Sequence, residues 1–251
     1  MSNDSKVLFG NCEDHLGKIR AESVDLVFTS PPYFNQRTEY AEYKSFADYI
    51  TQMAAIFKLC KTAMKPGGVF ALNIGQDREM DMPSHMSLLL ERLGFKYIDT
   101  ICWNKGSEIG TRGVFLESRM YYPNFSWEPI YIYRKPPKDL GFNMKAGDDF
   151  VKFEERFLPT ITTTFRTNVW DIIPERNSDH PAPFPERLAE VVIMCYSKQG
   201  DMVLDPFGGS GTTAVACEHL GNRDYILIER KKEYFDMIMR RLASTTGGLG
   251  L

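Results

Sequence analysis

A short turn near the start of the chain holds the first residues whose types and order could do chemistry. Residues 29–34 read TSPPYF and follow an apolar, β-branched run, 24–28, that is typical of a buried strand. Pro31 and Pro32 fix their φ angles and supply no N–H, so the turn offers hydrogen-bond acceptors and almost no donors. Tyr33 adds an aromatic face. The combination suits an aromatic amine, although a Pro-Pro pair can also do no more than end a strand.

A glycine-rich stretch far along the chain favours the chemical interpretation. A predicted strand, 202–205, runs into it, a helix from about residue 213 to 220 follows, and a second strand, 225–229, ends in an acid. Glycines allow backbone N–H groups and a helix N-terminus to approach a ligand closely. The carboxylate of Glu229 can hold both hydroxyls of a ribose. This unit predicts a nucleoside-binding site.

Three cofactors compete for that site. A nucleoside triphosphate requires a lysine before the threonine of its phosphate loop, and here Gly211 precedes Thr212. A nicotinamide dinucleotide remains an alternative, because residues 209–214 fit G-x-G-x-x-A, but a dehydrogenase normally opens its nucleotide domain with this unit. S-adenosylmethionine fits better, because it carries no phosphate and Asp205 suits its positively charged methionine end.

Strand and helix signals alternate around the two stretches. Strands are predicted at 7–9, 24–28, 69–74, 95–103, 128–133, 202–205 and 225–229, and helices at 13–19, 46–64, 84–93, 185–195, 213–220 and 231–242. Such alternation implies an α/β domain with a mostly parallel sheet. Ser45 is the expected N-cap of the second helix, residues 34–44 are expected to form a mobile loop, and residues 245–251 a flexible tail.

The alternation breaks down between residues 104 and 168, apart from the strand near 128–133. Arginines and aromatic residues mix there with Gly and Pro. Arginine reads guanine edges and aromatic rings stack on bases, so a nucleic-acid surface is one interpretation and a solvated surface insertion is the other.

Composition limits the possible classes of protein. With 251 residues, 43% hydrophobic and 25% charged, the chain is expected to form one large soluble domain or a domain with an insertion. Because the net charge is −3, any positive electrostatic potential that attracts nucleic acid must be confined to a local patch of the surface. Five scattered cysteines without a C-x-x-C indicate a reducing cytoplasm, with neither disulfides nor a zinc site. No apolar run reaches the roughly 18 residues of a membrane span, and the polar start is not a signal peptide.

The two motifs together resemble those of the DNA amino-methyltransferases. DPFGGSGTT at 205–213 follows TSPPY at 29–33, an order similar to that of the group called β. Residues 65–68, 128–130 and 180–185 resemble further blocks of that group, so the resemblance spans most of 7–240. It implies a Rossmann-like, seven-stranded, mostly parallel sheet with helices on both faces and a small target-recognition insertion. The expected catalytic domain is then 1–103 with 169–251, and the insertion 104–168.

The resemblance also implies the residues of the site. The catalytic candidates are Ser30, Pro31, Pro32 and Tyr33. The cofactor-binding candidates are Asn11, Cys12, Phe184, Asp205, Pro206, Phe207, Gly208, Gly209, Ser210, Gly211, Thr212, Thr213 and Glu229. Asn11 stands where the family usually has Asp, although its carbonyl oxygen can still accept from the adenine amine. Arg37, Arg112 and Arg119 are the DNA-binding candidates, and no metal is expected.

The chemistry of the turn can be stated without the family. The amine of adenine or cytosine is a poor nucleophile, because its lone pair is delocalised into the ring. If the Ser30 hydroxyl and the Pro31 carbonyl accept its two N–H bonds, that pair is localised toward a sulfonium methyl group. Stacking of the flipped base on Tyr33 offsets a loss of about a few kcal/mol. Methylation at cytosine C5 would instead need a nucleophilic cysteine, usually after a proline, and no cysteine here follows one.

The sequence therefore predicts a double-stranded DNA methyltransferase that uses S-adenosylmethionine. Many N4-cytosine enzymes of the family carry Ser where Ser30 stands, and many adenine enzymes carry Asp, so N4 of cytosine is favoured and N6 of adenine is the alternative. More distant alternatives are RNA or protein amide methylation, an NAD-dependent oxidoreductase and a silent DNA-binding module. A homodimer, a cognate restriction endonuclease and a cytoplasmic, nucleoid-associated location in a prokaryote or a phage-infected cell are expected.

Overall fold

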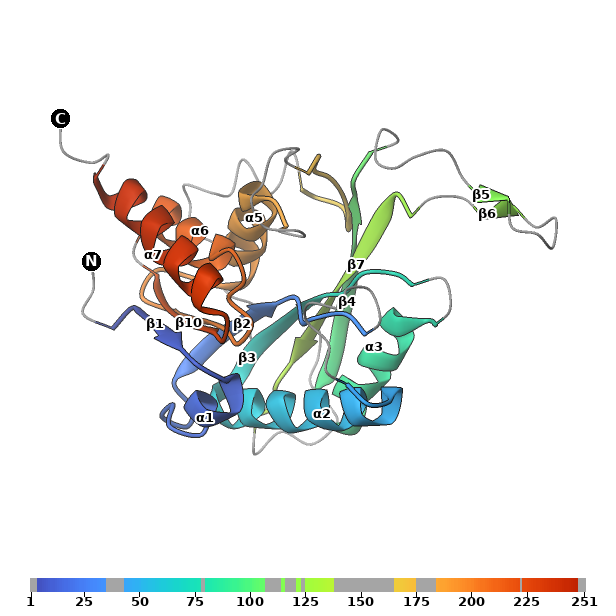
Figure 1. The fold of residues 1–251 in the computed structure, drawn as a ribbon, viewed down its shortest axis with the longest axis horizontal. Coiled ribbons are helices and arrows are strands. Elements are labelled where there is room, and N and C mark those ends of the chain that lie inside the picture. Colours follow the sequence, from blue (N-terminus) through green and yellow to red (C-terminus); the bar gives the residue numbers. More distant parts are fainter. Residues whose placement is uncertain are drawn as a thin grey trace.

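The computed structural model describes residues 4–34, 43–77, 80–106, 114–115, 121–122, 125–137, 165–174, 184–221 and 223–247. Within these residues the main feature is an eight-stranded sheet in the order β1-β10-β9-β2-β3-β7-β4-β8, with helices on both faces (Figure 1). Its strands are β1 Lys6–Phe9, β2 Val24–Thr29, β3 Met64–Asn73, β4 Lys96–Asn104, β7 Trp127–Arg134, β8 Val169–Asp171, β9 Met202–Asp205 and β10 Asp224–Glu229.

The sheet is mostly parallel, as predicted. Strands β1, β10, β9, β2 and β3 run parallel to one another, and β4 pairs with β8 in the same sense. Strand β7 is antiparallel to both β3 and β4. The described sheet has eight strands where seven were expected, because β8 is added at one edge. Three residues are too few for periodicity to predict a strand.

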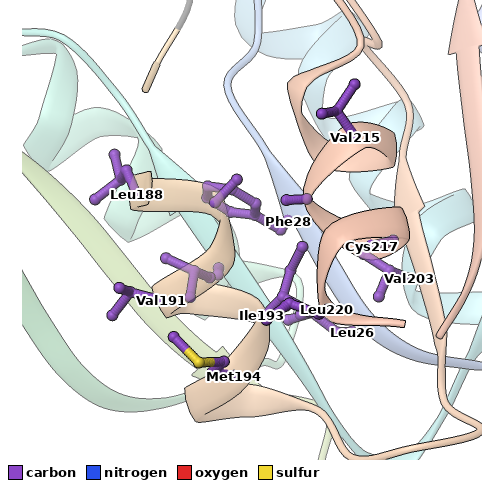
Figure 2. Packing of buried hydrophobic residues seen from close by; sticks show 14 of the residues in the cluster. Leu26, Phe28, Leu188, Val191, Ile193, Met194, Val203, Val215, Cys217 and Leu220 are labelled. Carbon is purple, nitrogen blue, oxygen red and sulfur yellow. The ribbon is translucent and has the colours of Figure 1, made fainter. Parts of the chain in front are cut away.

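Six helices in the described residues cover the two faces. They are α1 Cys12–Leu16, α2 Phe46–Ala63, α3 Met82–Arg92, α5 Glu186–Tyr196, α6 Thr212–Leu220 and α7 Lys232–Gly247. The first three share one buried cluster with the sheet, and the last three share another on the opposite face. Figure 2 shows the second cluster, where side chains of α5 and α6 pack on Leu26 and Phe28 of β2 and on Val203 of β9.

Several local predictions can be compared with this structure. Ser45 caps α2 as expected, since its hydroxyl accepts from the Asp48 N–H at 3.1 Å. Residues 65–68, just after the end of that helix, lie inside β3, where a Cβ on Gly68 would stand 3.0 Å from the Asp25 carbonyl oxygen. Helix α7 continues to Gly247, so 245–247 are helical rather than a flexible tail. Most of the expected loop 34–44 lies outside the described residues.

The centre of the sheet contains a topological switch point. From β2 the chain passes through α2 to β3 on one side, and from β9 it passes through α6 to β10 on the other. Strands β2 and β9 are neighbours, with Leu26 opposite Val203 and Val27 opposite Leu204. Open α/β sheets bind ligands at the carboxyl ends of strands where the order reverses in this way. The turns that follow β2 and β9 are the two stretches singled out in the sequence.

None of the described helices is long and apolar enough to span a bilayer.

Candidate active site

The two motif turns are joined by a buried carboxylate. Asp205, at the end of β9, accepts from the Thr29 hydroxyl at 2.7 Å and from the Phe207 N–H at 3.1 Å through Oδ1. Its Oδ2 accepts from the Thr213 hydroxyl at 2.8 Å. Burial raises the pKa of Asp205 to about 6, although these hydrogen bonds oppose the shift. Burial therefore disfavours the charged form of this carboxylate, and a bound cation would stabilise it.

Glu229 closes the other side of the glycine turn. Its two carboxylate oxygens accept from the backbone N–H groups of Gly209, at 2.8 Å, and Lys231, at 2.7 Å. Burial raises its pKa, and those backbone hydrogen bonds oppose the shift. Each carboxylate oxygen has two lone pairs, so both can still accept from a ribose hydroxyl.

The glycine turn itself depends on two positive φ angles. Gly209 has φ +53° and Gly211 has φ +81°, which residues with a side chain rarely adopt. A Cβ on Gly211 would also stand 2.9 Å from Ile238 of α7. The turn and α6, which starts at Thr212, are thus held against α7. Arg241 of α7 adds a hydrogen bond to the Ser210 carbonyl and an ion pair with Glu186.

The remaining cofactor candidates lie around this turn. The Gly10 N–H donates to the Glu229 carbonyl at 2.9 Å, which places Asn11 beside the end of β10. Asn11 is the N-cap of α1 but makes no capping hydrogen bond with its side chain. Cys12 is buried and donates to Glu13. Phe184 packs on Phe28 with ring centroids 4.8 Å apart, while Pro206, Gly208 and Ser210 are buried within the turn.

The catalytic candidates form a compact unit after β2. The Ser30 hydroxyl and the Tyr33 hydroxyl are 3.2 Å apart, within hydrogen-bonding distance. The Tyr33 ring lies against the backbone of Gly75, where an added Cβ would be 2.5 Å from its Cε2. Burial raises the pKa of Tyr33 well above its usual value, and the Glu128 carboxylate raises it further, so the hydroxyl stays protonated. Pro31 is buried and Pro32 half-buried.

The structure adds residues that the sequence analysis did not select. Thr29 joins the candidate Thr213 in holding Asp205, Gly75 makes room for Tyr33, and Arg241 holds the glycine turn. Glu128 belonged to a recognised sequence block but had no assigned role. It receives a hydrogen bond from Asn73 and pairs with Lys105. Most of these contacts join residues far apart along the chain, so no local sequence pattern predicts them. Arg37, Arg112 and Arg119 lie outside the described residues.

The site fits S-adenosylmethionine. A buried acid with a raised pKa, a turn with positive φ angles and a second acid with free lone pairs suit an ammonium group, a nucleoside backbone and a ribose. Fold and site together define a methyltransferase of the S-adenosylmethionine-dependent class.

Known proteins place the chain within that class. The profile of the N6_N4_Mtase family, described as DNA methylase, matches residues 24–240. The type II methyltransferase M.HpaI of Haemophilus parainfluenzae is 30% identical over 98% of this chain and 76% of its own length. M.HinfI of Haemophilus influenzae is 29% identical, over 94% and 67%. M.MwoI of Methanothermobacter wolfeii is 27% identical, and this chain spans only 34% of it. The chain belongs to the N6_N4_Mtase family and is a DNA methyltransferase.

Solved structures have the same fold. The cytosine-N4-specific PvuII DNA methyltransferase superposes with a TM-score of 0.75 at 20% identity, covering 98% of this chain and 92% of that one. TTHA0409 of Thermus thermophilus, complexed with S-adenosyl-L-methionine, gives 0.71 at 23% identity, covering 97% of both chains.

Proposed function

We propose that this enzyme methylates N4 of cytosine in double-stranded DNA. The observation that carries the choice of base is the Ser30–Tyr33 hydroxyl pair at the end of β2, beside the turn held by Asp205. A neutral hydroxyl can accept from the amine and also donate to the ring nitrogen beside it. S-adenosylmethionine supplies a methyl group on a positively charged sulfur.

The protein groups act on the amine by hydrogen bonding, while the transfer would break the sulfur–methyl bond, leave S-adenosylhomocysteine and release one amine proton to solvent. The Pro31 carbonyl and the Ser30 hydroxyl accept the two N–H bonds and turn the nitrogen lone pair out of conjugation with the ring. The neutral Tyr33 ring supplies a stacking surface, with its hydroxyl held by Ser30. Asp205 and Glu229 hold the cofactor's methionine and ribose ends. Positioning of this kind supplies much of the rate in a bimolecular transfer.

The cysteines support transfer to an amine rather than to carbon. Burial raises the pKa of all five thiols, and three of them, Cys12, Cys60 and Cys217, are buried side chains. Attack at cytosine C6, which C5 methylation requires, needs a thiolate near neutral pH. None of these thiols meets that requirement.

Adenine N6 is the second candidate, because adenine also carries a ring nitrogen next to its amine and the matching family covers both kinds of target by its name. The neutral Ser30 favours cytosine over adenine, since it is the position where a carboxylate would be expected for adenine. Both bases are activated by the same pair of acceptors.

The DNA-binding surface, the partners and the location belong to the same proposal. Residues 104–168, apart from the central strand β7, form the target-recognition insertion, and Arg37, Arg112 and Arg119 contact phosphates or bases. The enzyme acts as a homodimer in the cytoplasm, together with a cognate restriction endonuclease. The type II names of its relatives support that last partner.

The test is methylation of mixed, unmodified DNA followed by mass spectrometry of the nucleosides. We expect 4-methylcytosine. Appearance of 6-methyladenine alone would overturn the choice of base and leave the amine chemistry intact, whereas 5-methylcytosine would overturn the mechanism.

A further inference from the structure

Four polar side chains form a row beside the catalytic turn. The row lies where β2, β3 and β4 end and the antiparallel β7 begins. Its members, on these neighbouring strands or directly after them, are Ser30, Asn73, Glu128 and Lys105. The register of the strands places the four residues at similar positions along the sheet. Thr29 is opposite Leu72, Asn73 is opposite Ile130, and Trp103 is opposite Glu128.

The row also lies on one face of the sheet. Side chains alternate along a strand, so residues two apart point the same way. Each member of the row is two residues from a buried side chain of the cluster on the α5 face, namely Phe28, Ala71, Ile130 and Trp103. Neighbouring strands are about 4.8 Å apart, so Asn73 is the row's nearest member to Ser30.

Glu128 and the next residue fix the orientation of the Asn73 amide. The Asn73 Nδ2 group donates to Glu128 Oε2 at 3.2 Å and to the Pro129 carbonyl at 3.4 Å. A carboxylate and a carbonyl can only accept, so both require the NH₂ end of the amide to face β7. Lys105 holds the other Glu128 oxygen in an ion pair whose side chains are both mostly buried.

The carbonyl end of the same amide is left for another partner. Asn73 is 2% exposed, and among the described residues no protein group donates to its Oδ1. Strand β3 lies between β7 and β2, so the arm of the amide that faces away from β7 is on the side of the strand that leads to Ser30.

The negative charge of Glu128 also acts electrostatically on Tyr33 in the catalytic turn. After burial itself, the Glu128 carboxylate is the next cause of the raised pKa of Tyr33. The row therefore borders the place where the amine would lie between Ser30 and Tyr33.

We infer that Asn73 Oδ1 accepts an N–H of the target amine, and that Glu128, held by Lys105, is the positioning residue that keeps this oxygen turned to the base. The inference rests on the proposed function and extends it. In this arrangement Asn73 takes over the acceptor role that the proposed function gives to Ser30. Pro31 and Asn73 then accept the two N–H bonds, and the Ser30 hydroxyl is left to donate to the neighbouring ring nitrogen. Asn73 and Ser30 thus read the amine and the ring nitrogen separately.

The test compares Asn73→Ala, Glu128→Gln and the double variant in steady-state methylation of unmodified phage DNA with labelled S-adenosylmethionine. We expect kcat to fall about 100-fold in Asn73→Ala, in the range seen when one hydrogen-bonding group is removed from a reacting centre. Glu128→Gln should lower kcat about tenfold, because a glutamine side chain can donate as well as accept and so lets the amide rotate. Cofactor affinity, measured by calorimetry, should stay within about twofold in both.

The double variant separates positioning from general stability. If Glu128 acts through Asn73, the double variant is no slower than Asn73→Ala, whereas independent effects multiply. Asp25→Asn is the matched control, because Asp25 pairs with Lys65 at 2.7 Å near the opposite end of β2. It should keep the wild-type kcat. If Asn73→Ala does not fold cooperatively, Asn73→Ser retains a donor for Glu128 and should show the same loss.

The outcomes distinguish this inference from the function beneath it. A wild-type enzyme that labels no DNA overturns the proposed function and this inference with it. An active wild-type enzyme with an unimpaired Asn73→Ala, or a multiplicative double variant, overturns this inference alone.

Discussion

At the scale of single residues, Asp205 combines a structural role with a proposed role in cofactor binding. Its three hydrogen bonds from Thr29, Phe207 and Thr213 hold the turns after β2 and β9 together. Its pKa of about 6 shows that burial still disfavours the charged form, despite those bonds. A folded pKa above the usual carboxyl value means that ionisation lowers the stability of the unliganded fold as pH rises from about 4 to 6. A cation that binds the carboxylate reverses this loss.

This predicts a pH-dependent affinity for the cofactor. At pH 5, one unit below the pKa of Asp205, about nine-tenths of the carboxyls are protonated, so S-adenosylmethionine should bind about tenfold more weakly than at pH 7. Calorimetric titration at the two pH values measures the ratio. The Asp205→Asn variant, which cannot ionise, should bind weakly with no such ratio. Equal affinity of the wild type at both pH values would restrict Asp205 to holding the turns.

The two groups of site residues should separate in their effects. Ser30→Ala and Tyr33→Ala are expected to reduce methyl transfer at least about 100-fold and to leave cofactor affinity nearly unchanged, because these side chains would touch the base. Glu229→Ala should weaken cofactor binding first, since it removes the acceptor for Gly209 and for the ribose. Calorimetry together with a methylation assay measures both quantities. Loss of cofactor binding in Ser30→Ala with retention in Glu229→Ala would reverse the assignment.

At the scale of elements, the close packing of the glycine turn on α7 shapes the proposed cofactor site. Gly211 combines a positive φ with a position where a side chain would overlap Ile238. Arg241, further along the same helix, holds the Ser210 carbonyl. Helix α7 therefore supports the turn from behind, and its displacement would move the backbone groups proposed to bind the cofactor.

Gly211→Ala is expected to cost more stability than Gly200→Ala. Both positions have nearly the same φ, +81° and +83°, but a Cβ at Gly200 meets nothing within 4 Å. Backbone strain is thus common to the two variants, and only Gly211→Ala adds overlap with α7, worth about 1–3 kcal/mol. Urea unfolding measures the difference, which should be accompanied by weaker cofactor binding in Gly211→Ala alone. Equal losses of stability in the two variants would show that α7 can shift to accommodate the added Cβ with no loss of stability.

At the scale of the whole molecule, a net charge of −3 constrains how the enzyme meets a polyanion. The proposal assigns the phosphate contacts to a few arginines rather than to the protein as a whole. DNA affinity should fall as salt rises, and Arg112→Ala or Arg119→Ala should reduce the salt slope by about one each if each contacts a phosphate. Fluorescence anisotropy over a salt series measures the slope, with cofactor affinity as the control. Salt-independent binding would contradict the picture.

Much of the fold and the outline of the site could be predicted from the sequence, because their signals are local. The apolar run 24–28 ends at two prolines, and the strand of 202–205 ends in a glycine turn, so both appear in periodicity and backbone chemistry. The alternation of strands and helices likewise indicated a mostly parallel α/β sheet, which the structure confirms. The assignment of individual residues to base and cofactor stays a prediction.

Only the tertiary structure decided which distant residues come together at the carboxyl end of the parallel strands. The order β9-β2-β3-β7-β4 brings Thr29 to Asp205, puts Asn73 in contact with Glu128 and places it at the end of the strand next to the one that Ser30 follows. Gly75 likewise matters only because the Tyr33 ring lies on it. Strand pairing and register depend on the sum of many packing contacts between segments far apart in the chain. No short stretch contains that information, so the neighbours of the reacting groups emerge only when the sheet is assembled.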